Sequence, residues 1–164
     1  MACNIHIEDD FDLAKISRSG QCFRMNRLDD GSYRAIAGDK VLYIRQLEDG
    51  SFNISCTEDE WREFWHPYFD LDSSYSRVRQ ECAGKSDFID TTIQYGKGLR
   101  ILAQDPWEML VTFIISQRKS MPAIATAVNA LSERFGEPID TGRETVYAFP
   151  TPSALAQSTD EDLR

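Results

Sequence analysis

The chain has 164 residues, of which 41% are hydrophobic and 11% aromatic, so it has enough apolar material for a packed core and is not a disordered segment. Its formal net charge of −9 at pH 7 excludes a surface that is basic throughout, and any contact with a polyanion requires local clusters of Lys and Arg. The sequence contains neither a long uninterrupted apolar run nor a basic leader with an apolar segment behind it, which predicts a soluble, intracellular protein that is not secreted.

The charges are distributed unevenly along the chain. Residues 47–72 contain eight acids and one arginine, whereas residues 13–28 contain four bases and no acid, and residues 92–119 contain four bases and two acids. The last two segments are candidates for local basic surfaces, although ordinary solvated charge explains the same pattern.

The four cysteines show no metal-binding or disulfide pattern. None of them is paired as Cys-x-x-Cys, and His6 and His66 are the only histidines that could complete a metal site. We therefore interpret the cysteines as reduced thiols that act as small hydrophobic residues.

The first third of the chain is predicted to form an antiparallel meander. Four short segments rich in strand-forming residues are separated by Asp-Asp-Gly, Gly-Asp and Asp-Gly turns. The predicted strands are residues 22–27, 32–36, 40–46 and 52–56.

The periodicity becomes helical at Thr57. Thr57 and Glu60 have the spacing of a capping box, and Trp61, Trp65 and Tyr68 recur at helical spacing behind it. Two further short helices are predicted, over residues 72–83 and 87–95, the first ended by Gly84 and the second by Gly96.

Two longer helices are predicted in the second half. Asp105, followed by Pro106 and Glu108, predicts a helix that begins at Pro106. Its interior, residues 109–115, is almost entirely apolar, which indicates a core helix. An apolar stripe over residues 124–135 predicts a second helix, packed by one face and ended by Gly136.

The last residues predict an interrupted helix. Residues 152–157 form a short helical stretch, and residues 159–162 have the cap and acids of another helix start, directly before Arg164. Because one helical turn is not stable alone, we expect Arg164 to be a boundary within a longer protein.

Two motifs resemble those of the 8-oxoguanine DNA glycosylases, a family of the helix-hairpin-helix DNA glycosylase superfamily. Residues 19–24 (SGQCFR) resemble the family's Ser-Gly-Gln-x-Phe-Arg turn, and they follow a Phe-x-Leu segment at residues 11–13, as in that family. Residues 98–108 (GLRILAQDPWE), running into residues 113–116, resemble the family's entry to its helical domain. The resemblance extends, with gaps, from about Phe11 to Arg164, and the order of the two motifs is specific.

The resemblance implies an α+β fold. Residues 1–96 would form an N-terminal antiparallel twisted sheet with short helices, similar to the sheet of the TATA-binding protein. Residues 97–164 would begin an all-α glycosylase domain and stop before its helix-hairpin-helix. In the family the nucleophilic lysine and the aspartate come later, so no catalytic residue is expected before Arg164, and these residues alone are expected to be inactive.

The implied function is that of a DNA-repair glycosylase and AP lyase in base excision repair. Such an enzyme flips the oxidised purine 8-oxoguanine out of duplex DNA and excises it, and a lysine Schiff base then permits strand scission. Damaged double-stranded DNA is the implied partner, and no cofactor, metal or membrane is expected. The implied location is the cytoplasm, with the nucleoid, in a bacterium and the nucleus in a eukaryote.

The resemblance also implies two groups of site residues. The carbonyl of Gly20 would recognise the hydrogen on N7 of 8-oxoguanine, where guanine has an acceptor, and Gln21 would lie beside it. The exit of the apolar helix would contact DNA through Gln117, Arg118, Lys119 and Ser120. Simpler explanations remain open for both, since a tight turn also requires glycine and basic residues also complement a helix C-terminus.

The chain departs from the family in the same exit segment. The family has consecutive asparagines at the positions of Arg118, Lys119 and Ser120, and an arginine that reads the orphaned cytosine at the position of Ala123. Relaxed recognition of the opposite base is one explanation, and an alkylpurine substrate, as in 3-methyladenine glycosylases, is another. A non-catalytic interaction module is a further alternative, because the acidic residues 47–72 suit a basic protein partner.

Overall fold

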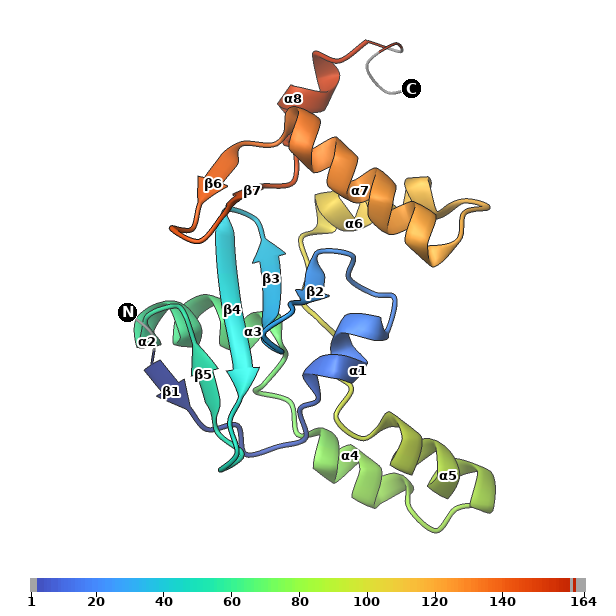
Figure 1. Ribbon diagram of the computed structural model, residues 1–164. Helices are drawn as coiled ribbons and strands as arrows, with labels where there is room; N and C mark the ends of the chain where they lie inside the picture. The colour runs from blue at the N-terminus through green and yellow to red at the C-terminus, as the bar shows by residue number, and fades with distance from the viewer. Residues whose placement is uncertain (1–2, 160, 162–164) are drawn as a thin grey trace. The chain divides into compact units, whose positions relative to one another are not determined.

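A five-stranded antiparallel sheet forms near the N-terminus of the computed structural model, which describes residues 3–159 and 161 (Figure 1). The strands are β1 (Cys3–Ile5), β2 (Met25–Arg27), β3 (Tyr33–Ala37), β4 (Lys40–Gln46) and β5 (Phe52–Ile54), in the order β1-β5-β4-β3-β2. Ile54 of β5 lies opposite both Cys3 and Ile44, and Ile44 and Ile54 are completely buried. The predicted meander is confirmed, with β4 over the predicted residues.

Two short elements of this region were not predicted. Strand β1 pairs with β5 at the edge of the sheet, and helix α1 (Leu13–Arg18) precedes β2. The Asp12 carboxylate accepts a hydrogen bond from the N–H of Lys15 at 3.0 Å, and Leu13 and Ile16 are buried. Elements of three to six residues contain too few positions for a clear sequence period.

The segment that begins at Thr57 is one continuous helix with a π-helical middle. It comprises α2 (Glu58–Glu60), η1 (Trp61–Trp65) and α3 (His66–Tyr68). The Thr57 hydroxyl accepts a hydrogen bond from the N–H of Glu60 at 3.2 Å, as predicted. The Glu60 carboxylate accepts one from the indole N–H of Trp65 at 2.9 Å, so Glu60 also fixes a fully buried tryptophan.

The next two helices form a hairpin in Figure 1. They are α4 (Tyr75–Cys82) and α5 (Asp87–Gly96), and the hydroxyl groups of Ser74 and Ser86 cap their N-termini. The helix predicted over residues 72–83 thus begins three residues late, because the Ser74 hydroxyl supplies its cap.

The described residues from 106 onward form three helices and a hairpin. These are α6 (Pro106–Ser116), α7 (Met121–Phe135), β6 (Pro138–Asp140), β7 (Thr145–Tyr147) and α8 (Pro152–Ala156). The Asp105 cap is confirmed, since its carboxylate accepts from the N–H of Glu108 at 2.8 Å. The hairpin was not predicted. Part of the helix start expected over residues 159–162 lies outside the described residues.

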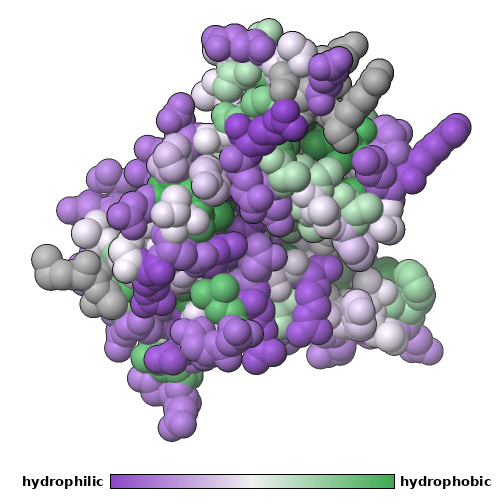
Figure 2. Space-filling view, turned by 45° about the horizontal axis from the view of Figure 1, so that its top comes forward, coloured by the Kyte–Doolittle hydropathy of each residue, from purple (hydrophilic) through white to green (hydrophobic). Residues whose placement is uncertain are grey.

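The prediction that α6 is a core helix is wrong for the described residues. Its buried residues are Glu108 and Thr112, whereas Leu110, Phe113 and Ile114 are 53%, 66% and 62% exposed. Apolar side chains surround the helix, but only some of them, Trp107, Val111 and Ile115, pack against the cluster of Ile124 and its neighbours. Figure 2 shows hydrophobic residues, in green, exposed at the molecular surface between hydrophilic residues, in purple.

The chain divides into two compact units. The first comprises Met1–Cys22, Asn26–Tyr33 and Leu42–Ala103, and the second comprises Phe23–Met25, Arg34–Val41 and Gln104–Arg164. The first has an aromatic core, in which Phe11 makes edge-on contacts with Phe52 and Phe69. The second has a core of Ile124, Val128 and Phe149.

The cysteines are free thiols, and Cys22 and Cys56 are buried, as expected for small hydrophobic residues. None of the helices in the described ranges has the length and apolar character needed to cross a bilayer.

Candidate functional site

The turn of the first motif follows helix α1. The Ser19 hydroxyl donates to the carbonyl of Ile16 at 2.8 Å and closes the helix. Gly20 has a φ of 80°, in the left-handed region that glycine adopts without strain. This conformation is a sufficient reason for glycine here, and Gly20 is partly exposed.

The side-chain amide of Gln21 joins the two motifs within the first unit. Its Nε2 donates to the carbonyl of Arg100 at 2.7 Å, and its Oε1 accepts from the N–H of Leu102 at 2.9 Å. The two bonds to one extended segment define the orientation of the amide. The side chain of Gln21, which was predicted to lie beside a bound base, therefore holds the turn against residues 100–102.

A close backbone contact lies beside this bridge. The N–H of Asp12 donates to the carbonyl of Gly98 at 2.9 Å, and Gly98 has a φ of 89°. A Cβ atom at Gly98 would lie 2.5 Å from the Cβ of Asp12. The glycine that opens the second motif is thus required by both its conformation and its neighbour.

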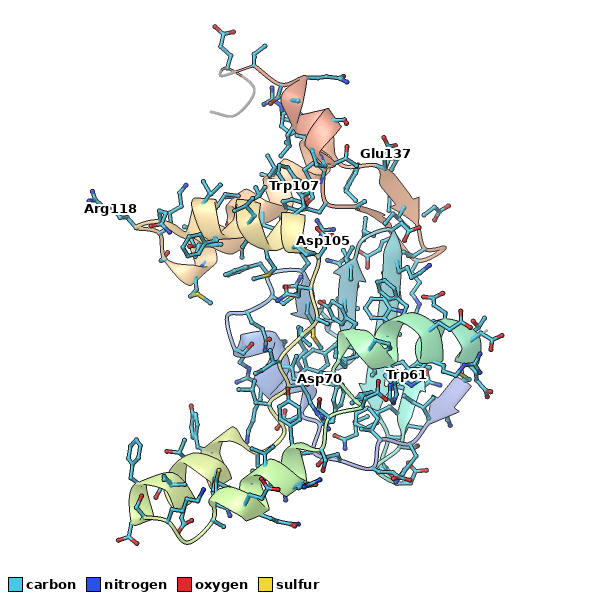
Figure 3. All side chains as sticks on the ribbon, turned by 180° about the vertical axis from the view of Figure 1, so that it is seen from behind. Trp61, Asp70, Asp105, Trp107, Arg118 and Glu137 are labelled. Carbon is cyan, nitrogen blue, oxygen red and sulfur yellow. The ribbon has the colours of Figure 1, made fainter. Side chains whose placement is uncertain are left out.

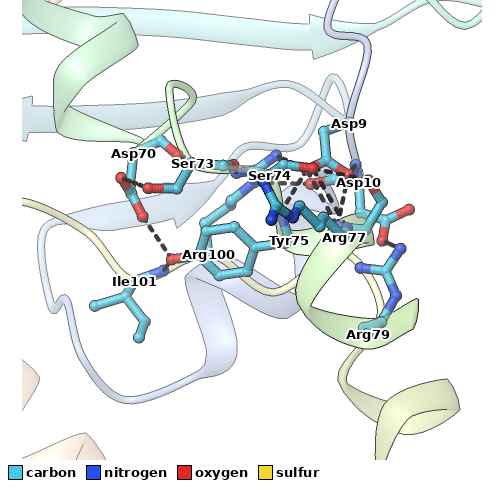
Figure 4. A network of polar contacts seen from close by, with 11 residues as sticks. Asp9, Asp10, Asp70, Ser73, Ser74, Tyr75, Arg77, Arg79, Arg100 and Ile101 are labelled. Carbon is cyan, nitrogen blue, oxygen red and sulfur yellow. Dashed lines mark hydrogen bonds and ion pairs between the residues drawn. The ribbon is translucent and has the colours of Figure 1, made fainter. Parts of the chain in front are cut away.

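Arg100 is completely buried and holds three segments of the first unit together (Figure 4). Its guanidinium donates to the carbonyl of Asp10 at 2.8 Å and to those of Asp70 and Ser73 at 3.0 and 2.8 Å. It also lies 4.4 Å from the ring centroid of Tyr75. Arg100 therefore does not belong to a basic surface, contrary to one reading of the charge pattern.

Asp9 balances the charge of Arg100. A carboxylate oxygen lies 3.4 Å from Nη2 of Arg100, and the N–H groups of Tyr75 and Ser76 donate to the same carboxylate. Burial disfavours the charged form of Asp9, but the bonds from Ser76 and Tyr75 and the charge of Arg100 together lower its pKa. The ion pair is thereby built into the N-terminus of α4.

A second buried ion pair joins the two motifs within the second unit. Arg24 is 2% exposed, and its Nε lies 3.9 Å from the carboxylate of Glu108. Arg24 also donates to the Ser132 hydroxyl and to the carbonyl of Tyr147. Burial raises the pKa of Glu108 to about 7, although Arg24 opposes that shift.

The exit loop of α6 presents its polar residues to solvent. Gln117, Arg118, Lys119 and Ser120 are all exposed, and Arg118 has a φ of 59°, which is uncommon for a residue with a side chain. Figure 3 shows Arg118 at the outer end of the loop, pointing away from α6 and α7. Within the described ranges, the side chains of Arg118 and Lys119 make no hydrogen bond or ion pair, so neither caps a helix carbonyl directly.

The described residues contain no group of three or more His, Cys, Asp or Glu side chains that could hold a metal ion.

Comparisons with known proteins agree with the two motifs. Residues 4–110 match the family described as 8-oxoguanine DNA glycosylase, N-terminal domain. The N-glycosylase/DNA lyase of Saccharomyces cerevisiae is 29% identical over 167 residues, which cover 93% of this chain and 44% of the relative. The chain thus spans less than half the length of this curated relative.

Two solved structures have closely similar backbones. MBOgg1, in complex with a low-affinity DNA ligand, is 34% identical with a TM-score of 0.91, and the match covers 99% of this chain and 56% of that one. The 8-oxoguanine glycosylase/lyase of Clostridium acetobutylicum, in its apo form, is 32% identical with the same TM-score and coverage. Because the family match includes more than half of the residues and contains the SGQCFR turn, the chain belongs to the family of 8-oxoguanine DNA glycosylase N-terminal domains.

Proposed function

We propose that the chain is the N-terminal part of a DNA-repair glycosylase and AP lyase that excises 8-oxoguanine from duplex DNA. The observation that carries this proposal is the SGQCFR turn, with Gly20 at a φ of 80° inside the region that matches the family. The names of the similar proteins support it, since they include an N-glycosylase/DNA lyase and an 8-oxoguanine glycosylase/lyase.

The carbonyl of Gly20 is the proposed lesion reader. 8-Oxoguanine has a hydrogen on N7 where guanine has an acceptor, so one well-placed carbonyl attracts the first base and repels the second. Gln21 contributes by fixing the turn, because its amide bonds to residues 100 and 102 restrict the backbone beside Gly20. A preformed acceptor avoids the cost of ordering the turn on binding.

Residues 117–120 are the proposed DNA-contacting loop. Arg118 and Lys119 are exposed and lack partners within the described ranges, and the left-handed conformation of Arg118 holds its side chain away from the two helices. Cationic side chains in this arrangement suit phosphate oxygens and the acceptor edges of bases.

The domain division and the location belong to the same proposal. Residues 1–96 would be the N-terminal sheet domain, and residues 97–164 the beginning of the helical glycosylase domain. Damaged double-stranded DNA would be the partner, so the protein would act in the bacterial cytoplasm with the nucleoid or in a eukaryotic nucleus.

Borohydride trapping on duplex DNA that contains 8-oxoguanine opposite cytosine tests the activity. The 164 residues are compared with the longest natural polypeptide that contains them, since the Schiff base requires a nucleophilic lysine. We expect trapping with the longer polypeptide alone. Trapping by the 164 residues would place the nucleophile in this chain, and trapping by neither would favour an alkylpurine glycosylase or a non-catalytic module.

Lesion recognition by the turn has a separate test. Gly20→Ala should reduce the preference for 8-oxoguanine over guanine in duplex binding, because the added methyl and the unfavourable φ displace the carbonyl. Gly50→Ala is the matched control, since Gly50 has a similar φ of 84° at a distant turn. An unchanged preference in Gly20→Ala would refute the proposed reader.

A further inference from the structure

Two hollows in the first unit flank helix α1 and share the residues Ala14 and Arg18. One, of about 360 Å³, is lined by both Arg18 and Arg27, together with Gln46. The other, of about 490 Å³, is lined by Lys15, Arg18 and Ser19, the residue before Gly20. The basic segment 13–28 thus contributes three cations around α1, beside the Gly20 turn: Arg18 and Arg27 in one hollow, and Lys15 in the other.

In the described part of the chain, Arg18 and Arg27 are not engaged by the fold. Both are exposed, and within the described ranges neither makes a hydrogen bond or an ion pair. Six other arginines each lie within ion-pair distance of a carboxylate: Arg24, Arg34, Arg62, Arg77, Arg79 and Arg100. Those six guanidinium groups are paired within the chain, whereas Arg18 and Arg27, like Arg45 and Arg118 elsewhere, remain available to a ligand, and Arg18 and Arg27 line the same hollow.

The acid that lines the same hollow is already engaged. The Asp12 carboxylate accepts from the N–H of Lys15 at the start of α1 and forms no ion pair with Arg18 or Arg27. The ammonium group of Lys15 donates to the carbonyls of Tyr95 and Lys97 at 2.9 and 2.6 Å. Those bonds hold a positive charge at the other side of α1 without neutralising it.

We propose that Arg18 and Arg27 form a binding site for the phosphodiester backbone of duplex DNA. A planar guanidinium donates two parallel hydrogen bonds to phosphate oxygens, and two such groups facing one hollow suit one or two adjacent phosphates. Arg18 is two residues from Gly20, a span of at most about 7 Å. The contact would therefore fall on the DNA close to a lesion that is held at the Gly20 turn.

This inference rests on the proposed function and adds to it a second anchoring surface besides residues 117–120. The overall charge of −9 disfavours DNA over most of the surface, so a local cationic hollow would help to orient the duplex. Phosphate contacts do not distinguish one base from another, and the site is therefore expected to serve affinity rather than lesion choice.

The test is the salt dependence of duplex binding by the 164-residue chain. Fluorescence anisotropy is measured with duplexes that contain either 8-oxoguanine or guanine opposite cytosine, between about 50 and 200 mM KCl. The double variant Arg18→Ala/Arg27→Ala is compared with Arg62→Ala/Arg77→Ala, which removes two exposed arginines and the same charge. Arg18→Lys/Arg27→Lys keeps the charge, and circular dichroism verifies that each variant is folded.

We expect the slope of log K against log salt to fall in magnitude by about 1.8 in the alanine variant, or 0.9 for each phosphate lost. The loss of affinity of the alanine variant, relative to the unmodified chain, should accordingly shrink about tenfold between the low and the high salt concentration. This loss should be the same for both duplexes, and the lysine variant should retain most of the slope. An unchanged slope, or an equal fall in the Arg62/Arg77 control, would overturn the site, as would absence of binding by the unmodified chain. Equal affinity of the unmodified chain for the two duplexes would instead count against the proposed lesion recognition.

Discussion

The buried pair of Arg24 and Glu108 predicts an unusual dependence of stability on pH. The Glu108 side chain is 12% exposed, and burial raises its pKa from 4.5 to about 7, while Arg24 at 3.9 Å opposes the shift. The folded chain thus binds a proton at Glu108 more tightly than the unfolded chain does. Stability from this group is therefore gained as the pH falls through about 7 towards 4.5.

The magnitude follows from proton linkage. With a pKa of about 7 in the folded state and 4.5 in the unfolded state, the group contributes almost nothing at pH 8 and about 2 kcal/mol at pH 5.5. Glu108→Gln removes the titrating group but keeps the side-chain shape. The difference in unfolding free energy between the original chain and this variant should therefore increase by about 2 kcal/mol from pH 8 to pH 5.5.

Urea denaturation followed by tryptophan fluorescence at the two pH values measures that difference. All other titrating groups are shared, so their contributions cancel in the comparison. Glu137→Gln, at an exposed glutamate of the same unit, is the control and should follow the original chain. A difference constant within about 0.5 kcal/mol would refute the role of burial, and one of opposite sign would show that the attraction of Arg24 exceeds the desolvation of Glu108.

Three further predictions concern packing and exposure. Gly98→Ala should destabilise the chain more than Gly50→Ala does, because both residues have positive φ but only at Gly50 would a methyl group have open space. Urea denaturation midpoints measure the two losses of stability, and equal losses would contradict the close contact of Gly98 with Asp12. Gln21→Ala should reduce the unfolding free energy by about 1–3 kcal/mol, since the N–H of Leu102 loses its acceptor, and a neutral effect in urea titration would show that the bridge contributes nothing. We expect the exposed apolar surface of α6 to cause concentration-dependent self-association, and Phe113→Ser should weaken it, because the substitution removes a 66% exposed aromatic side chain. Light scattering measures the association, and an original chain that is monomeric at all concentrations would refute this expectation.

Local chemistry made many of the element boundaries predictable. Thr57 and Asp105 accept hydrogen bonds from the N–H groups of residues three positions later, and each interaction depends only on a few consecutive residues. The glycine-containing turns are equally local, since their φ values reflect single positions. Strand β1 was missed for the converse reason, since it pairs with β5 about 50 residues away, and the strands β6 and β7 were missed because three residues contain too few positions for a clear period.

The candidate site shows the same division. The sequence was sufficient to pair the SGQCFR turn with the GLRILAQDPWE motif, and the family match confirms that pairing. Residues 117–120 remain a prediction as a DNA-contacting loop. The sequence did not indicate that Gln21 bonds to residues about 80 positions away, or that Arg100 is completely buried. Nor did the sequence distinguish the arginines that pair with carboxylates of the same chain from Arg18 and Arg27, which form no ion pair in the described ranges.

The sequence by itself determined the caps at Thr57 and Asp105, the glycine-containing turns of the first sheet and the family, because each depends on residues that are adjacent or at fixed spacing. Only the tertiary structure decided which side chains are buried and which remain exposed. Helix α6 is the plainest case, since Leu110 and Val111 are similarly hydrophobic neighbours, yet Leu110 is exposed and Val111 packs against the Ile124 cluster. The physical reason is that burial is a property of the surfaces brought together, and hydrophobicity alone does not specify which of them meet.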